Sequence, residues 1–196
     1  MPHKNIETTQ LRLPSQDEVC ALWEQFGVLP NIRRHSRQVC RVALTMCKWL
    51  EEAGCLFNKT LIETGALLHD LAKAYCLDKP GLSHNLEGQR ILERAGYPEL
   101  GEIVAKHVNL PAISYCDEWM LVFYADKRVL GEKVVSVDER FQYIHRVYGQ
   151  NNSDRLDRIK KDELLAYEVE ERLFKLLPDY SPQDLCAIFR ERKKDC

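Results

Sequence analysis

The 196-residue sequence lacks several features that would place it in a specialised class of protein. No stretch of about 18 apolar residues occurs anywhere in it, and its N-terminal segment has no apolar run of signal-peptide length. A cytoplasmic location without a membrane partner is therefore expected. The net charge is only −2, so the charge balance does not favour nucleic acid as the main partner.

The eight cysteines include no Cys-x-x-Cys pair. That spacing is typical of zinc sites and redox centres. In a chain with no secretory signal, reduced thiols that help to fill the core are expected instead. The cysteine pattern therefore favours neither a disulfide framework nor a cysteine-ligated metal.

Strand signals are scarce as well, whereas helix signals recur. A Ser or Thr followed three residues later by Glu, which is typical of a helix start, occurs at Ser15, Thr60 and Ser136. The only β-leaning stretch, KVVSV at residues 133–137, is too short to build a sheet. Helices are expected near residues 15–27, 30–54, 60–73, 83–96, 98–107, 117–131, 136–149 and 154–177, with a last helix opening at Ser181-Pro182.

These signals predict an all-α protein in two parts. Residues 1–150 form a helical bundle, and residues 151–196 form a C-terminal helical extension that begins after a polar loop. The extension carries a long apolar face, which indicates packing on its own core. Covering the site or pairing two copies in a homodimer are the alternatives.

The stretch GALLHDLAK, residues 65–73, places His69 and Asp70 side by side in an apolar run. Ionisable side chains are rarely buried without partners. A divalent cation would explain their presence, because it offsets the desolvation of all its ligands at once. Further candidate ligands each lie on a different expected helix: His35, His84, His107 and Asp126.

The order of these residues resembles the H…HD…D pattern of the HD superfamily of metal-dependent phosphohydrolases. HSRQVCRVAL, TGALLHDLAK and FYADKRV are similar to its three ligand segments. SHNLEGQRIL and IVAKHVN resemble the additional histidine segments of the subgroup named for His-Asp-Ile-Gly, although Leu71-Ala72 replaces Ile-Gly here. The resemblance covers about residues 30–130 and implies an HD-domain-like helical bundle.

The resemblance also implies a set of metal ligands. One ion would be held by His35, His69, Asp70 and Asp126. A second ion would be held by His84 and His107, with Asp70 bridging the two. Imidazole and carboxylate ligands suit divalent first-row metals, with iron or manganese favoured and zinc, nickel or cobalt as alternatives.

The implied activity is hydrolysis of a phosphoester or phosphoanhydride by a metal-activated water, with Asp70 central to catalysis. The expected partner is a small phosphorylated molecule, namely a nucleotide. The symmetrical bis(nucleosyl)-tetraphosphatases are the most specific branch that the sequence resembles. A sensor module that binds metal and nucleotide without turnover is the alternative.

Three cations near the ligands are candidates for contact with substrate. Lys73 follows Asp70 by three residues, so it can either neutralise a phosphoryl group during catalysis or simply form an ion pair with Asp70. Lys127 and Arg128 directly follow Asp126 and are expected to bind phosphate oxygens through charge-assisted hydrogen bonds.

Overall fold

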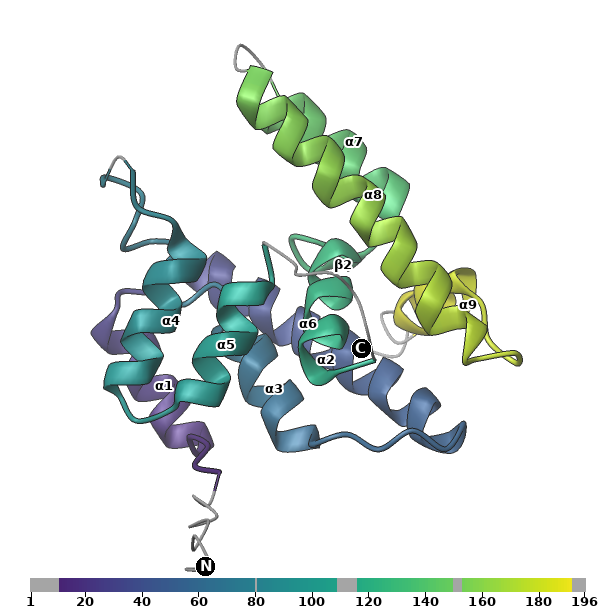
Figure 1. Ribbon diagram of the computed structural model, residues 1–196, viewed down its shortest axis with the longest axis horizontal. Helices are drawn as coiled ribbons and strands as arrows, with labels where there is room; N and C mark the ends of the chain where they lie inside the picture. The colour runs from purple at the N-terminus through teal and green to yellow at the C-terminus, as the bar shows by residue number, and fades with distance from the viewer. Residues whose placement is uncertain (1–10, 80, 109–115, 150–152, 192–196) are drawn as a thin grey trace, which may run out of the picture.

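The computed structural model describes residues 11–79, 81–108, 116–149 and 153–191, and within these ranges the fold is all-α apart from one small hairpin (Figure 1). This confirms the predicted class. The expected boundary at residue 150 lies outside the described residues. The elements are α1 (Gln16–Gln25), α2 (Pro30–Glu52), α3 (Lys59–Leu68), α4 (His84–Arg94), α5 (Pro98–Lys106), α6 (Glu118–Lys127), β1 (Val129–Leu130), β2 (Lys133–Val134), α7 (Val137–Tyr148), α8 (Ser153–Lys175) and α9 (Pro182–Glu191).

Helix α6 is the centre of the bundle (Figure 1). All its residues from Trp119 to Lys127 are buried, as expected for a helix that is apolar on every side. It packs against α2, α3, α5 and α8. Helix α2 carries an apolar stripe that includes Val39, Ala43 and Leu50, and all three are fully buried. His35 lies one turn before this stripe, so it is directed into the same core.

Two local expectations are wrong. The N-cap of α3 is Asn58, whose Oδ1 accepts the amide of Leu61 at 3.1 Å, and not Thr60. The helix also ends at Leu68, before the His-Asp pair, and turns follow to Asp78. The His69 ring bonds to the carbonyl of Ala66, which a continuing helix would use for the amide of Asp70.

The two capping boxes at Ser15 and Ser136 are present as predicted. The stretch KVVSV does contribute a strand, because Lys133 and Val134 pair with β1 in an antiparallel hairpin. This two-residue pairing is the only sheet in the described part of the chain. Its turn at Gly131 has a φ of 61°, which a glycine adopts without strain.

The C-terminal helices pack on the rest of the described chain. Helices α7 and α8 form a long antiparallel pair that extends from the body of the bundle (Figure 1). Helix α8 also contacts α6, and α9 contacts β2. Tyr180, between α8 and α9, stacks on Trp49 of α2 with ring centroids 4.2 Å apart.

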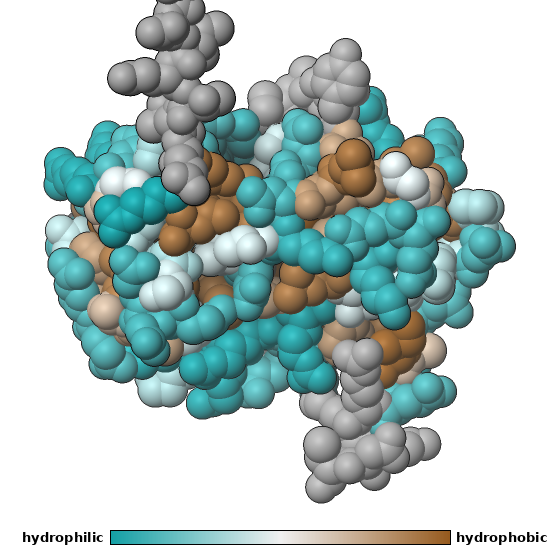
Figure 2. Space-filling model, turned by 90° about the horizontal axis from the view of Figure 1, so that it is seen from below, coloured by the Kyte–Doolittle hydropathy of each residue, from teal (hydrophilic) through white to brown (hydrophobic). Residues whose placement is uncertain are grey.

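The surface mixes polar and apolar residues, and one face of it is shown in Figure 2. Strongly exposed apolar side chains are spread over separate segments and include Leu56, Leu77 and Leu164. Among the helices that the structure describes, none combines the length and the apolarity needed to cross a membrane.

Candidate metal centre

Six ionisable side chains converge where several helices end. His69 is the C-cap of α3 and Asp70 follows it. His84 is the first residue of α4, and His107 is the C-cap of α5. The other two side chains come from the body of α2 and the last turn of α6, namely His35 and Asp126.

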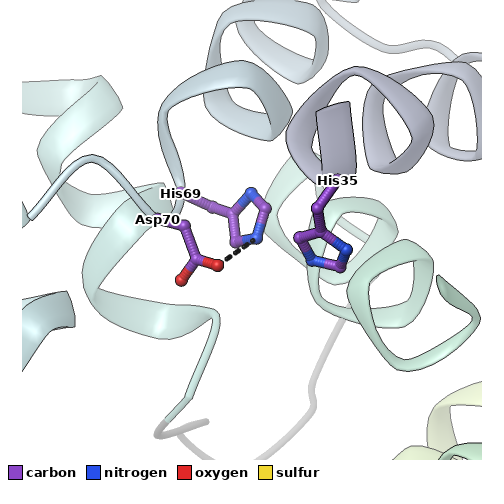
Figure 3. A group of neighbouring side chains, drawn as sticks. All are labelled: His35, His69 and Asp70. Carbon is purple, nitrogen blue, oxygen red and sulfur yellow. Dashed lines mark ion pairs between the residues drawn. The ribbon is translucent and has the colours of Figure 1, made fainter. Parts of the chain in front are cut away.

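His35, His69 and Asp70 form the first group, whose ligand atoms lie within 4.8 Å of one another (Figure 3). His69 Nε2 lies 3.5 Å from Asp70 Oδ2. Asp126 closes the group from α6, since its Oδ1 lies 3.0 Å from His35 Nε2 and 3.7 Å from His69 Nε2. These four residues are the set predicted to hold the first ion.

Backbone carbonyls orient three of the imidazoles. The Nδ1 atoms of His35, His69 and His107 lie within hydrogen-bond distance of the carbonyls of Gly131, Ala66 and Val104, respectively. A carbonyl can only accept, so each Nδ1 carries a proton and donates it. In a neutral ring Nε2 is then a lone-pair acceptor directed at the cluster, which is the usual arrangement of a metal-ligating histidine.

His69 shows most directly that the cluster fits a cation. Its ring is fully buried, and Nε2 has no hydrogen-bond partner although two carboxylates lie nearby. Burial lowers the pKa of His69 more than the charges of Asp70 and Asp126 raise it. The ring is therefore neutral, and its lone pair faces carboxylate oxygens with no proton between them. A cation placed among these atoms would satisfy all of them.

Asp70, His84 and His107 form the second group. Asp70 Oδ1 lies 3.5 Å from His84 Nε2 and 3.8 Å from His107 Nε2. The two imidazole Nε2 atoms lie 3.2 Å apart. Burial is the main cause that lowers the pKa of each ring. Asp70 therefore presents Oδ2 to the first group and Oδ1 to the second.

Close packing of α4 on α5 brings His84 and His107 together. A Cβ on Gly88 would lie 2.8 Å from Val104 Cγ1, so any larger residue would force Val104 or one of the helices to move. We expect Gly88→Val to lower the free energy of unfolding by about 1–3 kcal/mol through overpacking and to weaken metal binding by the second group. Urea unfolding and elemental analysis measure the two effects.

Arg90→Val is the matched control, because it places the same β-branched side chain on the exposed side of α4. It should leave both quantities nearly unchanged. If Gly88→Val retained its full metal content, the spacing of α4 and α5 would not determine the second group.

The two carboxylates of the cluster are ionised. Burial raises the pKa of Asp70, but the charge of Lys73 and the nearby imidazoles outweigh it, so the pKa lies below its usual range. For Asp126, burial is again opposed, chiefly by the charge of Lys127 and by the close approach of His35, and the pKa falls well below the usual range. Both groups therefore remain anionic ligands at neutral pH.

The two lysines predicted to contact substrate differ in accessibility. Lys73 Nζ pairs with Asp70 Oδ2 at 2.7 Å, and its side chain is 42% exposed. Lys127 Nζ donates to Asp126 Oδ2 at 2.8 Å and to the carbonyl of His107 at 3.3 Å, and its side chain is 8% exposed. Lys73 thus faces solvent beside the cluster, whereas Lys127 neutralises Asp126 from within the core.

Arg128 does not lie where the prediction of a phosphate-binding residue requires it. Its guanidinium is 1% exposed and pairs with Glu170 of α8. Nε donates to the carbonyl of Val135 and Nη2 to that of Pro182. All three nitrogens are thus engaged away from the cluster. The closeness of Arg128 to Asp126 in sequence was misleading, because side chains two residues apart on a helix point in different directions.

Arg140 was not singled out by the sequence, yet it lies against the cluster. Its side chain comes from the first turns of α7 and is 14% exposed, and Nη2 lies 3.9 Å from Asp126 Oδ1. Nε is buried without a hydrogen-bond partner. No motif marks this residue, and only the packing of α7 reveals its position.

Comparison with known families agrees with this geometry. The family model described as "HD domain" matches residues 32–141, more than half of the chain. The chain belongs to the HD-domain family. The matched region contains all six cluster residues as well as Arg140, and it excludes α8 and α9. As an HD-domain protein it is assigned, at the coarse level, to the metal-dependent phosphohydrolases.

One curated relative of this HD-domain protein is an uncharacterized protein of Methanocaldococcus jannaschii. The two are 25% identical over 159 residues, which cover 73% of this chain and 90% of the relative. No solved structure gave a significant match. The comparisons therefore support the family and its general chemistry, and the substrate has to be argued from the site itself.

Proposed function

We propose that this HD-domain protein holds two divalent metal ions and hydrolyses a phosphoester or phosphoanhydride bond of a nucleotide-like substrate. The observation that carries the proposal is the divided use of Asp70, whose two oxygens face two separate groups of ligands. A carboxylate that serves both groups is the simplest bridge between two ions. When bound, the metals supply Lewis-acid chemistry and activate water for attack at phosphorus.

Iron or manganese is the metal that we propose. The cluster offers imidazole and carboxylate ligands and no thiolate, a combination that suits these ions. Zinc, nickel and cobalt accept the same ligands and are the alternatives. The carbonyl-bound imidazoles keep their Nε2 lone pairs directed inward, so no ring has to reorient when a metal enters.

The charges of the cluster support a polyanionic substrate. Lys73 and Arg140 both lie beside the two carboxylates, and Lys73 is open to solvent. Metal bound to Asp70 would neutralise its carboxylate and weaken the ion pair with Lys73. We propose that Lys73 then binds an oxygen of the reacting phosphoryl group. Symmetrical dinucleoside tetraphosphates, which carry a long anionic bridge, are the first compounds to test.

The proposal predicts metal content and turnover together. Protein purified without chelator should contain about one or two transition-metal ions per chain. Loaded with manganese or iron, it should release product from at least one compound in a panel of mononucleotides, cyclic nucleotides and dinucleoside polyphosphates. Elemental analysis and chromatographic separation of the products provide the two measurements.

Two results would contradict this proposal. Protein that binds no transition metal would contradict the assignment of the ligands. Tight nucleotide binding to fully loaded protein without any product would favour a sensor that acts through a partner. Chelator-treated protein is the control, and it should regain turnover when metal is added back.

A further inference from the structure

Arg140 differs from the other buried arginine of the core in how its nitrogens are satisfied. Arg128 is 1% exposed, and each of its guanidinium nitrogens has an acceptor: the carboxylate of Glu170 or the carbonyl of Val135 or Pro182. Arg140, 14% exposed, has no acceptor for Nε, and its one described ion pair is 3.9 Å long. Leaving a guanidinium nitrogen buried and unpaired is costly. The fold thus satisfies one arginine completely and leaves the other with unused donors.

The guanidinium of Arg140 lies beside the cluster of candidate ligands, with Nη2 3.9 Å from Asp126 Oδ1. Its Nη2 is nearest to Asp126 Oδ1, the same oxygen that faces His35 and His69. The charge of Arg140 also acts on Lys73. The pKa of Lys73 is lowered by burial and by Arg140, but the charges of Asp70 and Asp126 outweigh both and raise it. Arg140 and Lys73 therefore both border the carboxylates that would hold the metals.

The charge of the cluster indicates an anion as the missing acceptor. Three cations, Lys73, Lys127 and Arg140, surround two carboxylates. These three cations outnumber the two carboxylates, so the arrangement is already positive, and bound metals would add further positive charge. Among the residues that the structure describes, no acceptor lies within hydrogen-bond distance of Nε, so an anionic ligand from solution is the acceptor that fits. A guanidinium presents two parallel N–H bonds, which match two oxygens of a phosphate.

We infer that Arg140 binds the phosphate of the substrate, with Nε–H and a neighbouring N–H donating to phosphoryl oxygens. The inference rests on the proposed phosphohydrolase function. Arg140 contacts the substrate and does not hold the metal, because a guanidinium carries no lone pair for a cation. It supplies the phosphate contact that was expected from Arg128.

The test compares Arg140→Gln and Arg140→Lys with wild type, each purified with its metal. Elemental analysis gives metal content, calorimetry gives the affinity for inorganic phosphate, and kinetics give kcat and KM on the nucleotide that is hydrolysed. We expect Arg140→Gln to keep its metal, to bind phosphate about tenfold more weakly, and to lose about 100-fold in kcat/KM. Arg140→Lys should recover part of both losses, since it keeps the charge and not the fork.

Arg146→Gln is the matched control, because Arg146 lies on the same helix and its guanidinium is near the ring of Tyr143. It should behave as wild type. Loss of metal from Arg140→Gln would overturn the inference, since it would show that Arg140 positions Asp126. Unchanged phosphate affinity, or a wild-type protein that binds no phosphate, would overturn it as well. The affinity for phosphate tests the role of Arg140 even if no nucleotide is hydrolysed. Failure of this inference can therefore be distinguished from failure of the proposed function.

Discussion

Asp70→Asn is expected to abolish turnover and to reduce metal binding in both groups. Asn keeps the size of the side chain and removes the charge that both groups share through Oδ1 and Oδ2. If the metals stabilise the transition state by several kcal/mol, losing them lowers kcat/KM by about 10³-fold or more. Elemental analysis and steady-state kinetics on the same preparation measure the two losses.

Asp78→Asn is the matched control for this substitution. Asp78 lies in the same run of turns and is exposed, so its variant should retain metal and activity. Circular dichroism of Asp70→Asn should show the wild-type helix content, because the surrounding helices do not depend on this carboxylate. A folded Asp70→Asn protein with full activity would contradict the assignment of the cluster as the catalytic centre.

Arg128→Ala is expected to produce the largest loss of stability. The substitution leaves Glu170 without its cation and removes the donors to the carbonyls of Val135 and Pro182. Breaking a buried pair in this way costs about 3–5 kcal/mol. The midpoint of urea unfolding should therefore fall, while the slope of the transition stays close to that of wild type.

Arg34→Ala tests whether the loss of stability arises because the ion pair of Arg128 is buried. Arg34 pairs with Glu132 at 2.7 Å, but both side chains are more than half exposed. Exposed ion pairs contribute about 0–1 kcal/mol, so this variant should unfold close to the wild-type midpoint. Equal effects of the two substitutions would mean that Arg128 does not link the bundle to the C-terminal helices.

Local signals in the sequence predicted local structure well. The capping boxes at Ser15 and Ser136 form because all their atoms lie within one turn of helix. The apolar stripe of α2 gives its buried face for the same reason. The end of α3 at Leu68 was not predictable in this way, since it accompanies a hydrogen bond from the His69 ring to Ala66.

In the candidate site, too, the sequence predicted what a motif marks and not what depends on the packing of distant helices. The order of His and Asp residues indicated which side chains converge, because that order is characteristic of a family of folds. It carried no information on the direction of Arg128 or on the approach of Arg140. Both depend on how α7, α8 and α9 pack in three dimensions, and neither belongs to a motif with fixed spacing.

The end of α6 contacts two parts of the molecule that are distant from each other in sequence. Asp126 belongs to the cluster, and Arg128, next but one in sequence, anchors the segment that carries Glu170 and Pro182. A ligand at Asp126 that shifts the end of α6 would therefore also act on the contacts of Arg128 with α8 and α9. Any such coupling is reciprocal, so the packing of α8 and α9 would change the affinity for that ligand by the same free energy.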